Sequence, residues 1–164
     1  MTVGNFGCGT QLMQNAENYD KHPIKKVVDQ LDMDVFPYPF PTNHFSSLVC
    51  RHTIEHLNSN PYDVMKELHR VTQQDGDVII ELPIFGNLVS HQRFLHSRNY
   101  MNPICARVST KDHNYISNLF EVTHFKKTQR CSIKKIMWKL KTRFLTWVDS
   151  FLYDGYEWTL KVKK

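Results

Sequence analysis

The residues Gly7-Cys8-Gly9-Thr10 stand between a short apolar run and an acidic residue, Asp20. Glycine has no Cβ, so it lets the backbone turn tightly and approach a ligand closely. An acidic residue at the end of the next strand can accept hydrogen bonds from ribose hydroxyls. This arrangement is typical of a strand–turn–helix nucleotide site, although a glycine pair by itself also occurs in ordinary turns.

The segment from His52 to His56 matches H-x-x-E-H, the pattern of inverted zinc peptidases. Two histidines four residues apart on a helix can share one face and one metal ion. The pattern is short, however, and it follows an apolar run directly. No downstream carboxylate can be singled out as a third ligand, so we expect no metal site.

Two further histidines, His91 and His96, come shortly after an apolar run that ends at Pro83. Imidazole titrates near neutral pH, so either side chain could take a proton from a substrate, or both could be surface-loop residues. Cys50 lies inside an apolar run. We expect it to be a small buried residue rather than a nucleophile.

One helix is clearly marked. Asn60 is a natural N-cap, Pro61 suits the first helical position, and Asp63 lies in the first turn. Apolar residues then recur at helical spacing, namely Val64, Leu68 and Val71. Asp75-Gly76 predicts a turn after this helix.

Strands are predicted on both sides of the helix. We expect them at residues 2–6, ending over 18–20, and at 26–29, 47–50, 78–82, 119–125 and 156–162. The alternating prolines of residues 36–41 predict an extended loop with its aromatic rings packed down, because proline fixes φ and removes a donor. The strand–helix–strand alternation implies right-handed crossovers and a parallel sheet.

The composition fits a single globular domain over residues 1–164, with 41% hydrophobic and 23% charged residues. No apolar stretch approaches the roughly 20 residues that span a bilayer, and the first residues do not look like a secretory signal. The four cysteines form no C-x-x-C pair. We therefore expect reduced thiols and a cytoplasmic location.

Several stretches together carry a family resemblance. They are Asn5-Phe6-Gly7-Cys8-Gly9-Thr10, Asn18-Tyr19-Asp20, the run from Pro39 to Phe45, the run from Cys50 to Leu57, and Glu67-Leu68-His69-Arg70-Val71 with Asp75-Gly76 and the strand to Pro83. With these motifs the chain resembles a class I S-adenosylmethionine-dependent methyltransferase, and more narrowly the methyltransferase type 11 family. Specific motifs cover roughly residues 2–84. Residues 85–164 show the expected order of strand, helix and strand.

The resemblance implies an α/β fold of the Rossmann-like, three-layer sandwich type. Its seven-stranded sheet would be mostly parallel, with an antiparallel last strand. Residues 1–84 would form the cofactor half of the domain, and residues 85–164 the substrate or cover half.

The resemblance also implies S-adenosylmethionine as the cofactor. In such proteins the glycine turn passes under the methionine part, the acid after the second strand holds the ribose, and an acid after the third strand meets the adenine amine. By position, the expected cofactor-binding residues are Asn5, Gly7, Cys8, Gly9, Asp20, Asp32, Met33, Arg51 and His52. Asp29 and Asp34 lie close enough to Asp32 that the acid for the adenine stays open.

The activity implied is methyl transfer to a small-molecule or sugar-like acceptor. Candidates for taking a proton from the acceptor are His52, Glu55 and His91, although Glu55 could instead cap its own helix. The usual signatures of nucleic-acid base methylation, a Pro-Cys dipeptide or an Asn-Pro-Pro-Tyr-like tetrad, are missing. Some features depart from the family: Gln11 stands where a third glycine is usual, and little chain precedes the first strand. They motivate a rival interpretation, an inactive cofactor-binding protein that serves as a partner subunit or membrane adaptor.

The formal charge of +5 is concentrated in one C-terminal segment. Its basic residues are Lys126, Lys127, Arg130, Lys134, Lys135, Lys139, Lys141 and Arg143. Apolar residues at steps of three and four predict a helix over about 133–153, which could cover the core, form a homodimer or substrate-lid surface, or contact an anionic membrane or another polyanion. No recognised nucleic-acid module accompanies it. Lysines in its first half oppose the helix dipole, which favours an external anion as the reason for their placement.

Overall fold

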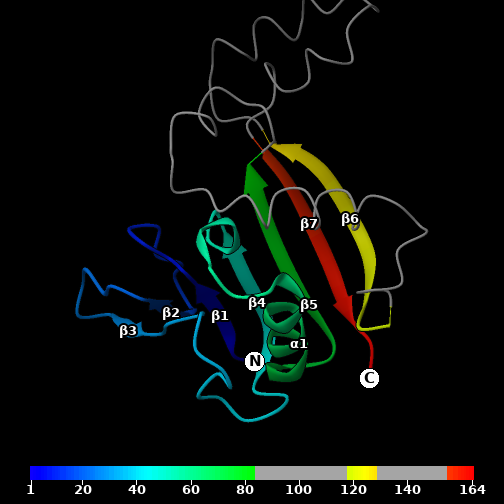
Figure 1. The fold of residues 1–164 in the computed structure, drawn as a ribbon, viewed down its shortest axis with the longest axis horizontal. Coiled ribbons are helices and arrows are strands. Elements are labelled where there is room, and N and C mark those ends of the chain that lie inside the picture. Colours follow the sequence, from blue (N-terminus) through cyan, green and yellow to red (C-terminus); the bar gives the residue numbers. More distant parts are fainter. Residues whose placement is uncertain (84–117, 129–154) are drawn as a thin grey trace, which may run out of the picture.

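The computed structural model describes residues 1–83, 118–128 and 155–164. In these residues the strands form one seven-stranded sheet in the order β3-β2-β1-β4-β5-β7-β6 (Figure 1). The strands are β1 (Val3–Phe6), β2 (Glu17–Asp20), β3 (Val28–Gln30), β4 (Phe45–Arg51), β5 (Thr72–Pro83), β6 (Phe120–Thr128) and β7 (Gly155–Val162). The described helices are the 3-10 turn η1 (Ile54–His56) and the α-helix α1 (Pro61–Val71).

The strand directions match the prediction from the sequence. The pairs β1–β2, β2–β3, β1–β4 and β4–β5 are parallel. Strand β7 is antiparallel to both of its neighbours, β5 and β6. The Rossmann-like fold, with a mostly parallel seven-stranded sheet and an antiparallel last strand, is therefore confirmed.

Helix α1 begins where the sequence predicts. The Asn60 side chain accepts a 2.9 Å hydrogen bond from the Tyr62 amide, and Pro61 occupies the first helical position. One helix face is buried and consists of Val64, Met65, Leu68 and Val71. These side chains join the same hydrophobic core as Leu48 and Ile80 of the sheet, so α1 packs on the sheet beside β5 (Figure 1).

Apolar side chains form a row across the sheet face that α1 covers. In order over β2, β1, β4, β5 and β7, the row consists of Tyr19, Phe6, Cys50, Ile80 and Trp158, all of them buried. Successive side chains of a strand point to opposite faces of the sheet. The neighbouring positions on the other face are mixed. Val49 and Ile79 are apolar, whereas polar side chains stand at Asn5, Asn18, Asp77, Glu81, Glu157 and Lys161. The face that α1 covers is therefore the more apolar of the two.

The proline-rich segment forms the extended loop that the sequence predicts. Tyr38 is buried, and the ring centroid of Phe40 lies 5.0 Å from that of Tyr19, whereas Phe36 stays 37% exposed. The Arg70 guanidinium of α1 donates to the carbonyl oxygens of Tyr38 and Phe40 at 3.0 and 2.8 Å. The loop thereby fastens α1 to the first strands of the sheet.

The prediction that Asp75-Gly76 form a turn between helix α1 and the next strand is wrong, because both residues lie inside β5. The pairing of β5 with β4 continues on both sides of this point, with a shift in register. Asp75 has a left-handed backbone (φ 58°), and a Cβ on Gly76 would lie 2.8 Å from the Ser46 carbonyl oxygen. The two residues form an irregular bulge in a longer strand rather than a turn that precedes it.

The connections between the first three strands are short. Residues 7–16 join β1 to β2 and residues 21–27 join β2 to β3, and this fully described part of the chain contains no helix. A parallel crossover usually takes about a dozen residues or more and contains a helix. Other groups must therefore satisfy the backbone of these connections.

Some of the sequence predictions concern residues outside the described ones. These are His91, His96 and the basic helix over 133–153.

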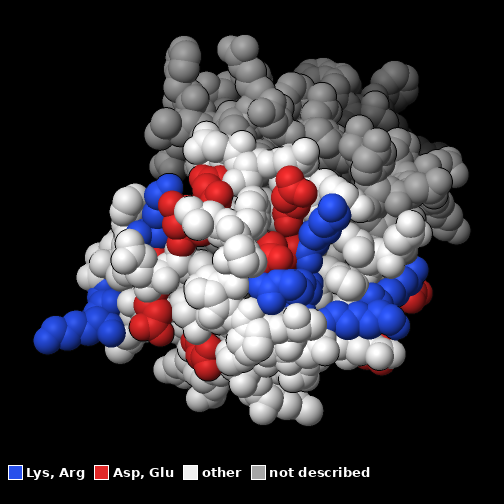
Figure 2. Space-filling model, turned by 60° about the horizontal axis from the view of Figure 1, so that its bottom comes forward, with Lys and Arg blue, Asp and Glu red and all other residues white. Residues whose placement is uncertain are grey.

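On the face shown in Figure 2, basic and acidic side chains are interspersed over the described surface. Among the described residues no helix is long and apolar enough to cross a membrane. The anionic surface as a partner of the basic helix stays a prediction.

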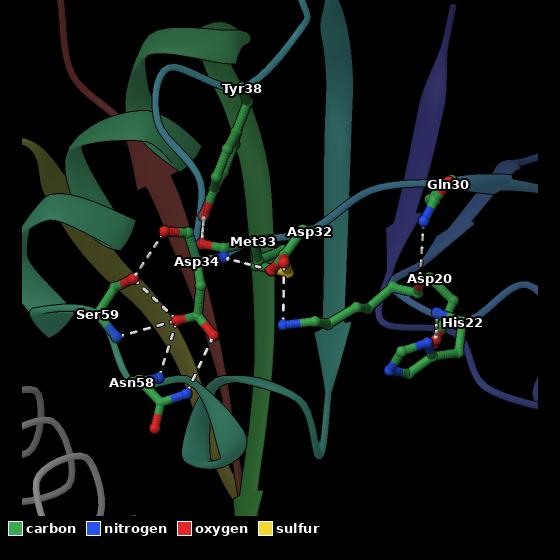
Figure 3. A network of polar contacts seen from close by, with 10 residues as sticks. Asp20, His22, Gln30, Asp32, Met33, Asp34, Tyr38, Asn58 and Ser59 are labelled. Atoms are coloured by element: carbon green, nitrogen blue, oxygen red, sulfur yellow. Dashed lines mark hydrogen bonds and ion pairs between the residues drawn. The ribbon is translucent and has the colours of Figure 1, made fainter.

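Asp34 ties the loop after β3 to the loop before α1 (Figure 3). Its carboxylate accepts hydrogen bonds from the backbone amides of Asn58 and Ser59 at 2.8 and 2.9 Å, and from the Ser59 hydroxyl at 2.8 Å. Burial by itself would raise the pKa of Asp34, but the bonds from Ser59 and Asn58 outweigh it and lower the pKa below its ordinary value. The charged carboxylate therefore stabilises the folded state.

We expect Asp34→Ala to lower the free energy of unfolding at neutral pH by about 1–3 kcal/mol, because hydrogen bonds to a charged group are lost. The folded-state pKa lies below the unfolded one. The contribution is therefore fully present above the unfolded pKa and is lost as the pH falls through the folded pKa. Urea unfolding should show wild type and variant converging below about pH 4. Asp29→Ala, which removes an exposed carboxylate of β3, is the control. An equal gap at acid and neutral pH would contradict this account.

Candidate functional site

A pocket lies at the carboxyl ends of β1 and β4. Strand β1 pairs with β2 on one side and with β4 on the other, so this is the topological switch point, where open α/β sheets bind ligands. The pocket has a volume of about 420 Å³. Residues 7–13 of the glycine turn line it, together with Asn5, Arg51 and His52.

The structure brings together most of the residues that the sequence predicts for cofactor binding. Those that line the pocket are Asn5, Gly7, Cys8, Gly9, Arg51 and His52. Asp20, Asp32 and Met33 are not among the lining residues. Of the residues predicted to take a proton, His52 lines the pocket, Glu55 does not, and His91 lies outside the described residues.

Both glycines of the turn have a left-handed backbone, with φ of +65° at Gly7 and +50° at Gly9. Side chains other than glycine rarely adopt this conformation. The space around the two glycines differs. A Cβ on Gly7 would lie 2.1 Å from the Cγ2 atom of Thr53, whereas a Cβ on Gly9 would meet no atom within 4 Å. Packing within the protein thus requires a glycine at position 7, while Gly9 borders open space in the pocket.

Thr53 fastens the glycine turn to the end of β4. Its hydroxyl lies 3.1 Å from the Gly7 carbonyl oxygen, 3.0 Å from that of Arg51 and 3.3 Å from that of Phe6. A hydroxyl donates one hydrogen, so these acceptors share it. Sequence reasoning missed this role, because a threonine next to a histidine motif carries no signal for a contact 46 residues away.

Asn5 and Asn18 hold the remainder of the loop that lines the pocket. They are buried and face each other in register between β1 and β2. Asn5 Nδ2 donates to Asn18 Oδ1 at 2.9 Å and to the Gln11 carbonyl oxygen at 3.0 Å. Asn18 Oδ1 also accepts a hydrogen bond from the Met13 amide, and Asn18 Nδ2 donates to the carbonyl oxygens of Met13 and Ala16. The predicted cofactor residue Asn5 therefore has its side-chain nitrogen engaged in shaping the loop.

Gln11 departs from the family pattern without disturbing the turn. Its backbone amide donates to the Cys8 carbonyl oxygen at 2.8 Å, and its own carbonyl oxygen accepts from Asn5. It is not one of the residues with a positive φ, and its side chain is exposed. Glycine is therefore not required at position 11 of this chain.

Asp20 ends β2 beside the glycine turn. One carboxylate oxygen accepts a 2.8 Å hydrogen bond from the Gly9 amide, and the other accepts a 2.9 Å bond from the His22 amide. Figure 3 shows Asp20 and His22 together at this strand end. A carboxylate offers about four acceptor positions. Asp20 can therefore hold Gly9 in place and still accept hydrogen bonds from a ligand.

Asp32 follows the end of β3, and both of its carboxylate oxygens have partners. One of its oxygens accepts from the Asp34 amide at 3.0 Å, and the other lies 2.9 Å from Lys21 Nζ (Figure 3). The hydrogen bond from Lys21 lowers the pKa of Asp32. Asp34 is engaged with the loop before α1, and Asp29 is exposed on β3. The predicted cofactor residue Met33 is 3% exposed and belongs to the hydrophobic core.

Carboxylates surround Arg51 and His52 on the side away from the glycine turn. Arg51 Nε lies 3.5 Å from Glu81 Oε2 and 3.8 Å from Glu157 Oε2. His52 Nε2 lies 3.0 Å from Glu81 Oε1, and its Nδ1 lies 3.5 Å from Glu55 Oε1. Sequence reasoning missed Glu81 and Glu157, because one glutamate in an apolar strand does not reveal its partner on another strand.

The H-x-x-E-H segment does not form one helix face. Only Ile54–His56 form a helical turn, and His52 precedes it with a left-handed backbone (φ 50°). Glu55 is fully buried, 3.5 Å from His52 Nδ1 and 4.0 Å from His56 Nε2. In the described part of the chain, no group of three or more His, Cys, Asp or Glu side chains is arranged to hold a metal ion.

Part of the chain matches a known family of proteins. Residues 6–80 match the family described as a methyltransferase domain, which confirms the resemblance predicted from the sequence. None of the curated proteins matches the chain.

Solved structures of known proteins align with almost the whole length of the chain. An S-adenosylmethionine-dependent methyltransferase from Archaeoglobus fulgidus has a TM-score of 0.64 at 13% identity, covering 98% of this chain and 85% of that one. The YcgJ protein from Bacillus subtilis has a TM-score of 0.62 at 14% identity, covering 99% and 92%. Geranyl diphosphate C-methyltransferase from Streptomyces coelicolor A3(2), in complex with Mg²⁺, geranyl diphosphate and S-adenosyl-L-homocysteine, has a TM-score of 0.56 at 10% identity, covering 99% and 71%. At these identities the likeness establishes the fold.

We expect Gly7→Ala to lower the free energy of unfolding by about 2–4 kcal/mol, from overpacking against Thr53 and from the left-handed backbone. The double variant Gly7→Ala with Thr53→Ala should lose less stability than the sum of the two single variants. The closest contacts, with Thr53 Cγ2 at 2.1 Å and Oγ1 at 2.3 Å, are then removed, and only the contact with Cβ at 2.7 Å stays. Urea unfolding of the four proteins measures this coupling. Strictly additive losses would contradict the contact. Gly9→Ala, with open space at its Cβ, should cost only about 1–2 kcal/mol.

The two described cysteines should resist modification in the folded protein. Cys50 is fully buried, and burial raises its pKa to about 12. Burial, followed by the negative charge of Asp20, raises the pKa of Cys8. Since the thiolate is the reactive form, a thiol reagent at about pH 8 should label both residues only after denaturation. Peptide mapping by mass spectrometry follows each cysteine separately. Rapid labelling of Cys50 in the native protein would show that the strand is not buried as described.

Proposed function

We propose that this chain, whose residues 6–80 match the methyltransferase-domain family, is an S-adenosylmethionine-dependent methyltransferase that acts on a small-molecule or sugar-like acceptor. The observation that carries the proposal is the open space beside Gly9 at the switch point of the sheet. There the backbone is left-handed, no atom would meet a Cβ, and the Asp20 carboxylate lies within hydrogen-bond distance of the Gly9 amide.

The residues of the pocket, together with two acids outside its lining, fit this cofactor. S-adenosylmethionine, when bound, supplies a methyl group whose carbon is attached to a positively charged sulfur and is open to in-line attack. In our proposal the turn of Gly7, Cys8 and Gly9 passes under the methionine part, with Asn5 below it. Asp20 accepts hydrogen bonds from the ribose hydroxyls, and Asp32 accepts one from the adenine amine.

Arg51 and His52 form the opposite wall of the pocket in this proposal. The Arg51 guanidinium supplies a positive charge that suits the carboxylate of the amino acid part of the cofactor. Holding the cofactor and the acceptor in line supplies most of the rate enhancement, because positioning replaces a bimolecular encounter.

The proton released by the acceptor needs a base. His52 lines the pocket and is our first candidate, whereas Glu55 is buried behind it and would act by orienting the imidazole. Because His52 Nε2 lies 3.0 Å from Glu81 Oε1 and Nδ1 lies 3.5 Å from Glu55 Oε1, one of these contacts must open before the imidazole takes the proton. His91 remains a candidate from the sequence and lies outside the described residues. A small-molecule acceptor is in keeping with the geranyl diphosphate methyltransferase that shares the fold.

The partners of the protein form part of the same proposal. They are a small-molecule acceptor, an anionic membrane surface or polyanion at the basic segment over 133–153, and a second copy of the chain. A cytoplasmic location, with peripheral membrane contact through that segment, would suit an enzyme of this kind.

The rival function is an inactive, cofactor-binding partner or adaptor protein. Gln11 in place of a glycine and the short chain before the first strand are the sequence features that motivate it. The backbone at Gln11 has no positive φ, so the turn is formed without that glycine. Formation of S-adenosylhomocysteine in the presence of any acceptor would separate the enzyme from the inactive protein.

We expect Asp20→Ala to weaken S-adenosylmethionine binding by about 1.5–3 kcal/mol, because hydrogen bonds to a charged group are lost. Gly9→Ala should weaken it by at least as much, since its methyl group would enter the open space that the ligand needs. Isothermal titration calorimetry measures both. Asp63→Ala, which removes a carboxylate on α1 far from the glycine turn in sequence, is the control. Unchanged affinity in both variants would remove the assignment of this pocket to the cofactor.

A further inference from the structure

A row of charged side chains crosses the sheet directly beyond the buried apolar row. Register places Arg51 of β4 opposite Glu81 of β5, Glu81 opposite Glu157 of β7, and Glu157 opposite Lys126 of β6. Glu81 and Glu157 are 5% and 8% exposed. Two buried carboxylates thus stand in directly opposed positions on neighbouring strands.

Like charges at directly opposed positions of a sheet repel each other. Two cations offset this repulsion. Lys126 Nζ lies 2.6 Å from Glu157 Oε1, and the Arg51 guanidinium lies within 3.8 Å of both Glu81 and Glu157. Arg51 is therefore held between the two carboxylates, on the same edge of the sheet as the pocket that it lines.

Glu81 holds the next residue of the pocket as well. The His52 amide donates to the Glu81 carbonyl oxygen at 2.9 Å, and His52 Nε2 lies 3.0 Å from Glu81 Oε1. His52 has a left-handed backbone, a conformation that persists in a residue other than glycine only when its surroundings hold it there. Backbone and side chain of the same glutamate supply that constraint.

The fold by itself gives little reason for a carboxylate at position 81. The strand around it is apolar, running Val78-Ile79-Ile80-Glu81-Leu82. Replacing a buried ion pair with apolar residues of similar volume is often neutral or stabilising. Glu81 does not line the pocket, yet it contacts Arg51 and His52, the two pocket residues at the end of β4.

We propose that Glu81 is a positioning residue, which fixes Arg51 and the left-handed His52 in the geometry that binds the cofactor. Its two carboxylate oxygens have separate partners, since Oε1 holds the imidazole and Oε2 holds the guanidinium. The inference rests on the proposed function, because it assigns the positioned residues to the cofactor pocket.

The test is Glu81→Gln, which keeps the size of the side chain but offers one acceptor oxygen instead of two. If the glutamine oxygen accepts from Arg51, its NH2 group faces His52 Nε2, which must then be the unprotonated nitrogen of the ring, so the contact with His52 changes. The matched control is Asp77→Asn on the same strand and face, which weakens the ion pair with Lys161 at 3.3 Å. Each protein is examined by urea unfolding, by calorimetry with S-adenosylmethionine, and by NMR of the histidine side chains without ligand. His52→Gln assigns the His52 signals.

We expect Glu81→Gln to shift the ligand-free His52 signals and to raise the Kd for S-adenosylmethionine about tenfold. Its free energy of unfolding should be no lower than that of Asp77→Asn. Asp77→Asn should leave both the His52 signals and the Kd unchanged. Unchanged His52 signals or an unchanged Kd in Glu81→Gln would overturn the positioning role. Should Glu81→Gln fail to fold, Glu81→Asp is judged by the same readouts.

Failure of the proposed function gives a different result. If the wild-type protein does not bind S-adenosylmethionine, the pocket is not a cofactor site and the proposed function falls. The ligand-free NMR signals still decide whether Glu81 positions His52, because that readout needs no ligand.

Discussion

The buried hydrogen bond between Asn5 and Asn18 is the interaction on which the pocket depends. It joins β1 to β2 side by side, and the remaining amide groups of both residues bond the backbone of residues 11–16. The connection between these strands is too short for a crossover helix. Its backbone groups therefore cannot pair within a helix, and a buried backbone group without a partner costs free energy. The two asparagine side chains supply those partners and thereby fix the loop that lines the pocket.

The glycine turn depends on this loop from one side and on β4 from the other. Asp20 holds the Gly9 amide, Thr53 packs against Gly7, and the left-handed backbone at both glycines brings the chain close to the pocket without side chains in the way. The turn is thus held by polar contacts and close packing rather than by a helix. A rigid turn of this kind offers backbone amides and open space in fixed positions, which lowers the ordering cost of binding a ligand.

The sequence predicted well what local patterns encode. Strand order along the chain, the capped start of α1 at Asn60, the glycine turn and the acid at Asp20 all rest on neighbouring residues, and the structure contains each of them. The sequence predicted poorly the features that depend on pairing between strands far apart in the chain. Asp75-Gly76 has ordinary turn chemistry, but pairing with β4 on both sides keeps it inside β5. Thr53, Glu81 and Glu157 act on residues far away in sequence, so no local pattern could reveal them.

The different faces of the sheet explain how one set of strands serves both stability and a site. The row from Tyr19 to Trp158 buries apolar surface beneath the proline-rich loop and α1, and this burial drives folding without directional requirements. One residue further along β4, β5 and β7, and on the other face, stand Arg51, Glu81 and Glu157. Each of these charges costs desolvation and is tolerated because a partner lies opposite. Because strand registry sets both rows together, the packing that buries Cys50 and Ile80 also determines where Arg51 meets its carboxylates. The position of the pocket wall is therefore a consequence of the core.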